Sequence, residues 1–163
     1  VLEVTYDEDL NPSLFTYEPD PGEVVQAAIP VSEHLTWEAA AERAPFRLLK
    51  PAFIPESQGG VDEVLYHPAR PRSPDEHVTI FYRGDRSSGS LWITQRAKRD
   101  TRSHEEFAWD ELNVDGRLFE VSDPGTEDGL RLLTFEQDGT DVNITSDLPT
   151  QELVRIAVSM AAV

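Results

Sequence analysis

The sequence contains no cysteine. Disulfide bonds, thiolate nucleophiles and metal sites built on cysteine are therefore excluded. No stretch approaches the roughly 18 apolar residues in a row that a membrane-spanning helix needs. Basic residues are scarce, with 14 Lys and Arg against 31 Asp and Glu, and the formal net charge is −17. Contacts to a phosphate backbone need a basic face, so we expect no nucleic-acid binding.

The acidic side chains gather at the two ends of the chain. Residues 1–33 hold eight Asp and Glu and no Lys or Arg, and residues 104–163 hold 14 against three. The middle, residues 34–103, is balanced, with nine acidic and 11 basic side chains. The simplest interpretation is a solvated surface kept soluble by charge repulsion, with adaptation to high salt as a variant. An acidic face for cations or for a basic partner is the alternative.

Length and composition indicate one domain. A chain of 163 residues with 39% hydrophobic side chains is long enough to bury a sizeable core. The sequence begins at Val1 without Met or a signal peptide, so we interpret it as a fragment or a mature form. Residues 1–32 are expected to be an N-terminal extension with a strand at residues 2–6 and a further strand candidate at residues 24–29. Residues 33–162 are expected to form the core.

The clearest pattern lies near the C-terminus. Apolar and polar residues alternate over residues 130–135 and again over residues 142–145, as in two strands. Between them, Asp138-Gly139 predicts a tight turn, because glycine adopts positive φ without a Cβ clash. After Pro149 the apolar period changes from two to about 3.6, which predicts a helix that covers the hairpin. The apolar side of this helix comprises Leu153, Val154, Ile156, Ala157, Met160 and Ala161.

A second, shorter helix is predicted near residues 37–44. Thr36 is a good N-cap, Glu38 suits the first turn, and Pro45 ends the helix. The apolar segment that follows is bracketed by Pro51 and Pro55. Proline lacks the amide that a central strand must donate, so this segment suits an edge strand or a clamp laid across the end of a sheet.

Further strands are predicted at residues 61–66, 78–82, 91–94 and 118–121, where β-forming residues lie between turn signals. Strands that follow one another in hairpins, without intervening helices, indicate antiparallel pairing. We therefore predict an α+β fold, with an antiparallel sheet of about five to seven strands and the C-terminal helix packed on one face. The short helix would lie at an edge of this sheet or beside it.

We find no pattern of catalytic or cofactor-binding residues. The histidines at positions 34, 67, 77 and 104 lack the spacing of a helical metal pair, and the serines lie in no nucleophile elbow. Gly59-Gly60 is too short for a phosphate-binding loop. We therefore expect a protein that is not an enzyme and that holds neither a cofactor nor a metal ion.

Two groups of residues are candidates for binding. On the strand pattern, Phe81 and Trp92 point away from the face of Ile80 and Leu91, where they form either a second core layer or an apolar groove for a peptide or lipid. A basic cluster follows, which either pairs with the acidic body or contacts anionic lipid head groups or a partner. The candidate binding surface thus comprises Phe81, Trp92, Arg96, Lys98, Arg99 and Arg102.

Four segments together resemble a known family. They are residues 35–55 (LTWEAAAERAPFRLLKPAFIP), 78–95 (VTIFYRGDRSSGSLWITQ), 114–121 (VDGRLFEV) and 132–160 (LLTFEQDGTDVNITSDLPTQELVRIAVSM). In this order they resemble a bacterial domain-of-unknown-function family found outside the membrane, often at the C-terminus of anti-sigma-factor-like proteins or lipoproteins.

The resemblance implies a non-enzymatic sensor or protein-interaction module outside the cytoplasm, at the cell surface or in the periplasm. It also implies a membrane tether before Val1 in the parent protein and a partner that is a protein or a cell-envelope component. The family has no established catalytic residues, so no site is transferred from it. A more distant likeness, to lipoprotein-carrier sheets, leaves open a carrier of a lipid or other apolar ligand on a concave sheet face.

Overall fold

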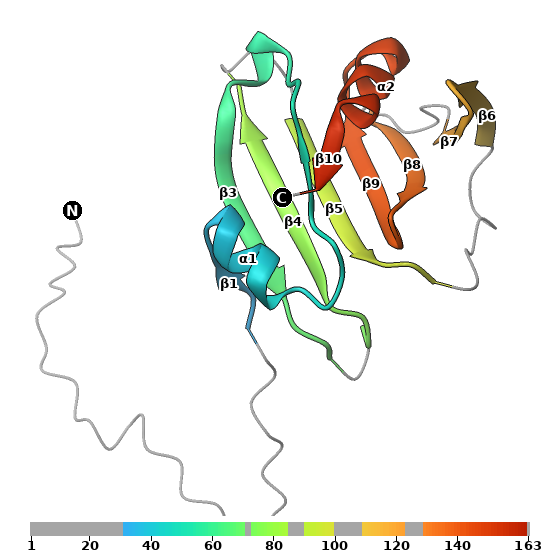
Figure 1. The fold of residues 1–163 in the computed structure, drawn as a ribbon. Helices are drawn as coiled ribbons and strands as arrows, with labels where there is room; N and C mark the ends of the chain where they lie inside the picture. Colours follow the sequence, from blue (N-terminus) through green and yellow to red (C-terminus); the bar gives the residue numbers. More distant parts are fainter. Residues whose placement is uncertain (1–30, 71–72, 85–89, 100–108, 123–128, 163) are drawn as a thin grey trace, which may run out of the picture.

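A computed structural model describes residues 31–70, 73–84, 90–99, 109–122 and 129–162 (Figure 1). These residues form one large antiparallel sheet in the order β1-β3-β4-β5-β9-β8-β7-β6. Its strands are β1 (Glu33–His34), β3 (Gly60–His67), β4 (His77–Arg83), β5 (Ser90–Ala97), β6 (Trp109–Val114), β7 (Arg117–Ser122), β8 (Arg131–Gln137) and β9 (Thr140–Ser146).

The remaining elements lie on this sheet. The helices are α1 (Trp37–Arg43) and α2 (Thr150–Val158), with a short 3₁₀ helix, η2 (Glu56–Gln58). β2 (Leu49–Pro51) and β10 (Met160–Ala162) pair as a second, two-stranded antiparallel sheet. No helix in the part of the chain that the structure describes is long and apolar enough to cross a membrane.

The predicted α+β class is confirmed, but the predicted strand number is too low, because the main sheet has eight strands. The strands that the prediction lacks are the two at the edges. β1 has only two residues, too few for any periodicity to show. β6 is exposed or half-buried throughout, and the two adjacent acidic residues Asp110 and Glu111 break the alternation of apolar and polar residues. The strands predicted at residues 2–6 and 24–29 lie outside the described residues.

The C-terminal hairpin forms as predicted. Asp138 and Gly139 both adopt positive φ, of 53° and 76°, which is the two-residue turn geometry that matches the twist of paired strands. The helix after Pro149 ends at Val158, however, so the prediction that Met160 and Ala161 continue it is wrong. The Ser159 hydroxyl donates to the Ile156 carbonyl at 2.7 Å, and the chain then pairs with β2 as a strand.

The proline-bracketed residues 52–54 form no strand, because β2 ends at Pro51, just before them, and it is β2 that lies over the covered face of the sheet (Figure 1). Gln95 of β5 is fully buried, and its amide group holds β2 in place. It accepts a hydrogen bond from the Leu49 amide at 2.8 Å and donates one to the Leu49 carbonyl at 2.7 Å. Thr140 adds a bond to the Arg47 carbonyl at 2.7 Å. Side chains of the sheet therefore satisfy backbone groups of Arg47 and of β2. In the bracketed segment itself, the Ala52 and Phe53 amides bond Ser159, at the end of α2, so the predicted clamp across the end of the sheet is not what forms.

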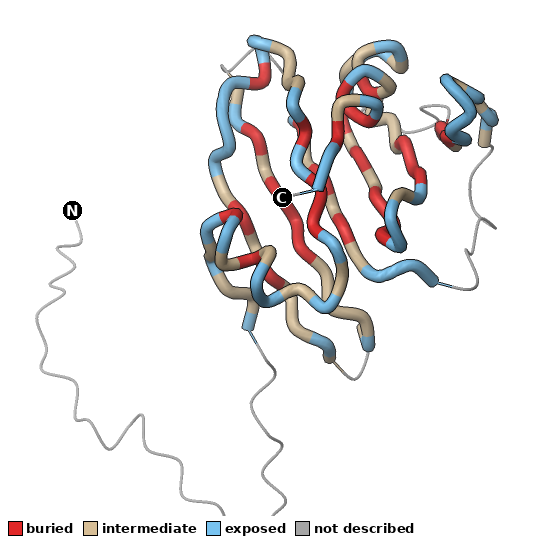
Figure 2. Tube along the Cα trace, in the orientation of Figure 1, coloured by how far each residue is buried: buried red, intermediate tan, exposed pale blue. Residues whose placement is uncertain are grey.

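The core lies between the sheet and these covering elements (Figure 2). Leu153, Ile156 and Ala157 of α2 are completely buried, and Trp37 and Ala40 bring α1 onto the same core. Burying one large aliphatic side chain contributes about 1.5–3 kcal/mol. The α2 stripe therefore accounts for a substantial part of the stability of the C-terminal half.

α1 begins as its sequence predicts. The Thr36 side chain accepts a hydrogen bond from the Ala39 amide at 3.2 Å, and Ala44 ends the helix in an extended conformation before Pro45. The Arg43 guanidinium makes two bonds of 2.8 and 2.9 Å to the Glu33 carboxylate, which connects the helix to β1. α1 is thereby fixed at the β3 edge of the sheet.

Candidate functional site

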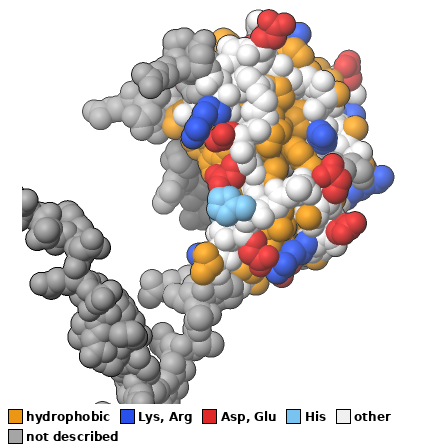
Figure 3. All heavy atoms as spheres, turned by 90° about the vertical axis from the view of Figure 1, so that its left-hand side faces the viewer, with side chains coloured by type: hydrophobic (Ala, Val, Ile, Leu, Met, Phe, Trp, Pro, Cys, Tyr) orange, Lys and Arg blue, Asp and Glu red, His pale blue; other side chains and the backbone are white. Residues whose placement is uncertain are grey.

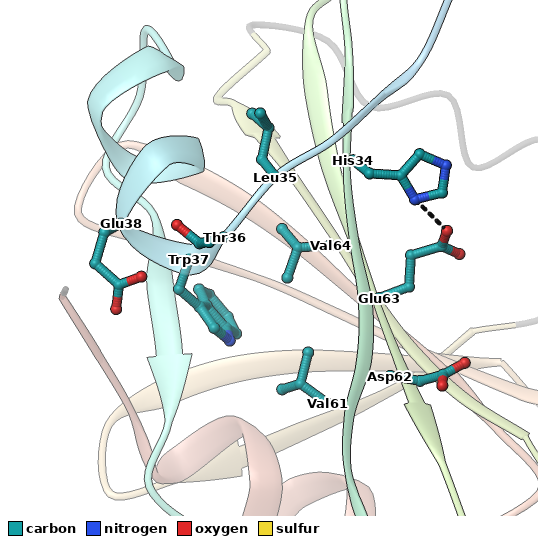
Figure 4. A pocket seen from close by; sticks show the side chains of 9 residues that line it. All are labelled: His34, Leu35, Thr36, Trp37, Glu38, Val61, Asp62, Glu63 and Val64. Atoms are coloured by element: carbon teal, nitrogen blue, oxygen red, sulfur yellow. Dashed lines mark ion pairs between the residues drawn. The ribbon is translucent and has the colours of Figure 1, made fainter.

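A pocket of about 370 Å³ lies at this edge, between α1 and β3 (Figure 4). Its position follows from how little of β3 is paired there. β1 pairs only with Leu65 and Tyr66, and the Leu35 amide adds one bond to the Val64 carbonyl at 2.9 Å. Within the described residues, β3 from Gly60 to Glu63 has β4 on one side and no strand on the other.

The two sides of this edge differ in chemistry. In the close-up, Val61 and Val64 project toward Trp37, whereas Asp62 and Glu63 project to the other side of β3 (Figure 4). The register of β3 shifts between Val61 and Glu63, so a bulge lies at this point. An extended segment beside β3 would therefore meet apolar groups on one side and carboxylates on the other.

The polar rim of the pocket is mainly acidic. Glu38 stands at the start of α1, where hydrogen bonds from its own backbone amide and from Thr36 lower the pKa of its carboxyl. Glu63 contacts the His34 ring at 2.6 Å, and Asp62 lies 3.3 Å from the Arg83 guanidinium. The view onto this side of the molecule shows carboxylates beside uncovered hydrophobic atoms (Figure 3).

Trp37 has an unsatisfied polar group at the pocket. The side chain is only 7% exposed, and its Nε1–H has no hydrogen-bond partner in the described part of the chain. Leaving such a buried donor unpaired costs about 1–3 kcal/mol. An acceptor brought into the pocket within reach of this N–H would recover that free energy.

A second polar cluster lies on the uncovered face of the sheet, at the His67 end of β3. His67 and His77 are register partners on β3 and β4, and their rings stack with centroids 4.3 Å apart and planes 9° from parallel. Arg96 is the register partner of His77 on β5, and Asp141 that of Arg96 on β9. Arg70 lies in the loop after β3 and donates to the Ser32 hydroxyl at 3.2 Å.

Both histidines have a lowered pKa. Burial is the largest cause for each. The neighbouring His77 and Arg70 lower the pKa of His67 further, and Arg96 and Arg70 do the same for His77. The two rings are therefore mainly neutral at pH 7.

The structure brings Phe81 and Trp92 together, as the sequence indicates. They are register partners on β4 and β5, both half-buried, and they lie on the face opposite the fully buried Ile80 and Ile93. Both helices and the β2–β10 sheet pack on the other face. The pair therefore belongs to the outer face of the sheet and not to the main core.

The predicted basic cluster is divided. Lys98 pairs with Glu136 at 2.8 Å, and Arg99 forms an ion pair with Asp75. Arg96 lies instead beside His77, its register partner on β4, and lowers the pKa of that histidine. Arg102 lies outside the described residues. The prediction that this cluster pairs with acidic groups thus holds for Lys98 and Arg99.

Sequence reasoning did not find the pocket at β3. Its apolar groups, Val61, Val64 and Trp37, are ordinary core residues by pattern, and its carboxylates are a few among 31. They form a site because β1 ends after two residues and leaves the rest of β3 without a neighbouring strand on this side, within the described residues. A strand of two residues gives no signal in the sequence. The excess of acid in the chain was the one pointer toward a basic partner.

Among the described residues, no group of three or more His, Asp or Glu side chains gathers as metal ligands would. Comparison with models of known families and with curated proteins finds no match to this chain. The resemblance to the extracytoplasmic family therefore stays a prediction, and the function is argued from the geometry alone.

Proposed function

We propose that this protein is a non-enzymatic interaction module that binds an extended, basic segment of a partner protein along the free edge of β3. The observation that carries the proposal is the pocket in which an unpaired strand edge, an apolar wall and carboxylates meet. An added strand gains backbone hydrogen bonds from the edge, and its side chains supply the specificity.

The charge of the pocket selects the kind of partner. Asp62 and Glu63 lie on one side of β3, and Val61 and Val64 lie on the other. Side chains of an extended segment alternate between two sides, so the best partner alternates basic and apolar residues. Its basic side chains would face the carboxylates, and its apolar side chains would pack near Trp37.

The carboxylates at the β3 edge disfavour two other segments that could pair with it, a second copy of the chain and residues 1–30 of the same chain. A second copy of this chain would bring its own Asp62 and Glu63 against those of the first, and like charges facing each other repel. Residues 1–30 of the chain contain acidic residues and no Lys or Arg, so they also lack complementary charge. Bulges and charges at an edge are the usual protection against unwanted strand pairing.

The alternative of a lipid carrier has less support. The face of the sheet that the helices cover is filled by side chains that are 0–7% exposed. The pocket at β3 is rimmed by carboxylates, which an acyl chain would strip of water at a cost of several kcal/mol. Location outside the cytoplasm and a membrane tether rest on the family resemblance and are part of the proposal.

A peptide titration tests the proposal. A five-residue peptide that alternates Lys and Val should bind the full chain saturably, and its Glu–Val counterpart should not. Reversing both charges with D62K and E63K should weaken binding of the Lys–Val peptide at least about tenfold, since two facing ion pairs are replaced by repulsion. Glu111→Lys on the distant strand β6 serves as the matched control.

Calorimetry gives the affinities, and thermal unfolding shows that each variant is folded. Equal binding of the two peptides, or equal loss of affinity in the Glu111 variant, would reject a site at β3 in favour of general attraction between opposite charges.

A further inference from the structure

The cluster at the far end of the outer face holds two buried hydrogen-bond donors that lack an acceptor among the described residues. Arg70 and Arg96 approach the stacked His67–His77 pair from the loop after β3 and from β5. The Nε–H groups of both arginines are buried and have no hydrogen-bond partner within the described residues. Two guanidinium groups with buried, unpaired donors beside two histidines are the composition of an anion site.

The hydrogen bonds of the cluster determine the tautomer of His77 and allow one for His67. The Ser32 hydroxyl accepts a bond from Arg70, so its own hydrogen is free to go to His67 Nδ1, 2.8 Å away. The Asp75 carbonyl can only accept, so His77 Nδ1, 3.3 Å from it, carries the hydrogen there. Neutral His77 therefore has its lone pair on Nε2, and a proton taken up at this atom creates a new donor.

We propose that this cluster binds a tetrahedral oxyanion of the phosphate or sulfate class, whose oxygens accept hydrogen bonds from Arg70 and Arg96 beside the His67–His77 stack. The guanidinium forks match the geometry of such oxygens, and the bound anion would supply the acceptors that both Nε–H groups lack. This proposal is independent of the peptide site, because the two sites use different residues.

The same geometry disfavours a metal ion in this place. Two parallel, stacked rings cannot direct their in-plane lone pairs at one point between them, and two arginines repel a cation. The nearest carboxylates are already engaged. Asp75 pairs with Arg99, and Asp141 accepts the Arg99 backbone amide at 3.1 Å.

Anion binding should strengthen as the pH falls. A bound anion stabilises the protonated form of each ring and so raises the two pKa values that burial and the arginines lower. By linkage, affinity then rises up to about tenfold per pH unit for each proton taken up. The charged and titratable groups around the site are His67, Arg70, Asp75, Glu76, His77, Arg96, Arg99 and Asp141.

Sulfate is the sharpest probe, because its charge stays constant between pH 5.5 and pH 7.5. Titration of the full chain, followed through the histidine ring signals by NMR, should show saturable binding that is about tenfold or more tighter at pH 5.5. Arg96→Gln should weaken binding about tenfold at both pH values, since it removes one charged donor pair. His77→Gln should keep part of the affinity and flatten its pH dependence.

Arg117→Gln is the control, because Arg117 bonds Gln137 on the β7–β8 side of the sheet, outside the cluster. No saturable binding by the wild type, or equal weakening in this control, would overturn the proposal. Titrations with glycerol phosphate and with vesicles of phosphatidylglycerol then show whether the bound anion is a soluble ligand or a lipid head group. Binding of the former identifies a soluble ligand, and binding of the latter alone identifies a lipid head group.

Discussion

The two halves of the sheet are built differently. In the half that we call closed, α2 and the β2–β10 pair cover strands β5, β9 and β8. Ile93, Ile144 and Leu133 on these strands are completely buried, and Gln95 bonds the backbone of β2. At the β3 edge, α1 covers less, Val61 remains 43% exposed, and Trp37 has an unpaired donor. The closed half is covered throughout by fully buried side chains, whereas the open half has the surface left for binding.

The largest effect should come from removing the closing elements. Deletion of residues 149–163 removes α2 and β10 and uncovers Leu133, Phe135 and Ile144. We expect cooperative unfolding to be lost, which calorimetry would show as the absence of a sharp transition. A truncated chain that still melts sharply would mean that the closed half is stable without its cover.

Gln95→Leu should have the next largest effect. The change replaces the polar amide by an apolar side chain of similar size and leaves the Leu49 amide and carbonyl buried without partners. Each unpaired group costs about 1–3 kcal/mol, so we expect a loss of about 2–5 kcal/mol in chemical denaturation. Gln137→Leu is the control, because Gln137 is only half-buried and its two hydrogen bonds, from the Arg117 guanidinium and to the Met160 carbonyl, are both 3.2 Å long. An equal loss in both variants would contradict the special role of Gln95.

Ile156→Ala tests the packing of α2 on the sheet. Ile156 is completely buried, so the cavity and the lost transfer free energy should cost about 2–5 kcal/mol. Val158, on the same helix, is 37% exposed, and Val158→Ala should cost less than about 1 kcal/mol. Urea denaturation of the two variants gives the comparison directly, and similar losses would show that α2 has no buried side.

In the open half, a substitution at Trp37 should change the unfolding free energy much less. Trp37→Phe removes the unpaired Nε1–H and keeps most of the aromatic surface. We expect a change in unfolding free energy within about 1 kcal/mol, because the lost packing is offset by removal of an unsatisfied donor. A loss above about 3 kcal/mol would show that the indole N–H is needed for folding.

The histidine pair predicts a modest dependence of stability on pH. The pKa values of His67 and His77 are lowered in the folded state, so the unfolded chain binds more protons below about pH 6.5. The contribution of neutral rings to stability is therefore present above that pH and is lost as the pH falls through the folded pKa values. Urea midpoints at pH 7.5 and 5.5 should differ less in the H67Q/H77Q double variant than in the wild type.

The same division explains what the sequence could predict. In the closed half, the C-terminal hairpin, its turn and the start of α2 follow from periodicity and glycine geometry, because burial of one face forces a regular pattern. Met160 was assigned to the helix because its apolar spacing fits both a helix and the strand that it joins. Pairing with β2, 109 residues earlier at Pro51, leaves no local signal.

The candidate sites were harder to predict, since both depend on strands far apart in sequence. The sequence shows Arg96 as part of a basic cluster. Its neighbours His67 and His77 come from other strands, and their spacing in the sequence does not indicate a site. Phe81 and Trp92 were correctly placed on one face, because register within a hairpin follows from alternation. The edge of β3 that no described strand covers could not be predicted, because it results from where β1 stops.

Hydrogen exchange at the β3 edge tests the central claim most directly. If an alternating Lys–Val peptide adds a strand there, backbone amides between Gly60 and Val64 should exchange at least about tenfold more slowly at saturating peptide, while those of β6 stay unchanged. Unchanged exchange along β3, with the peptide bound elsewhere or not at all, would contradict the account.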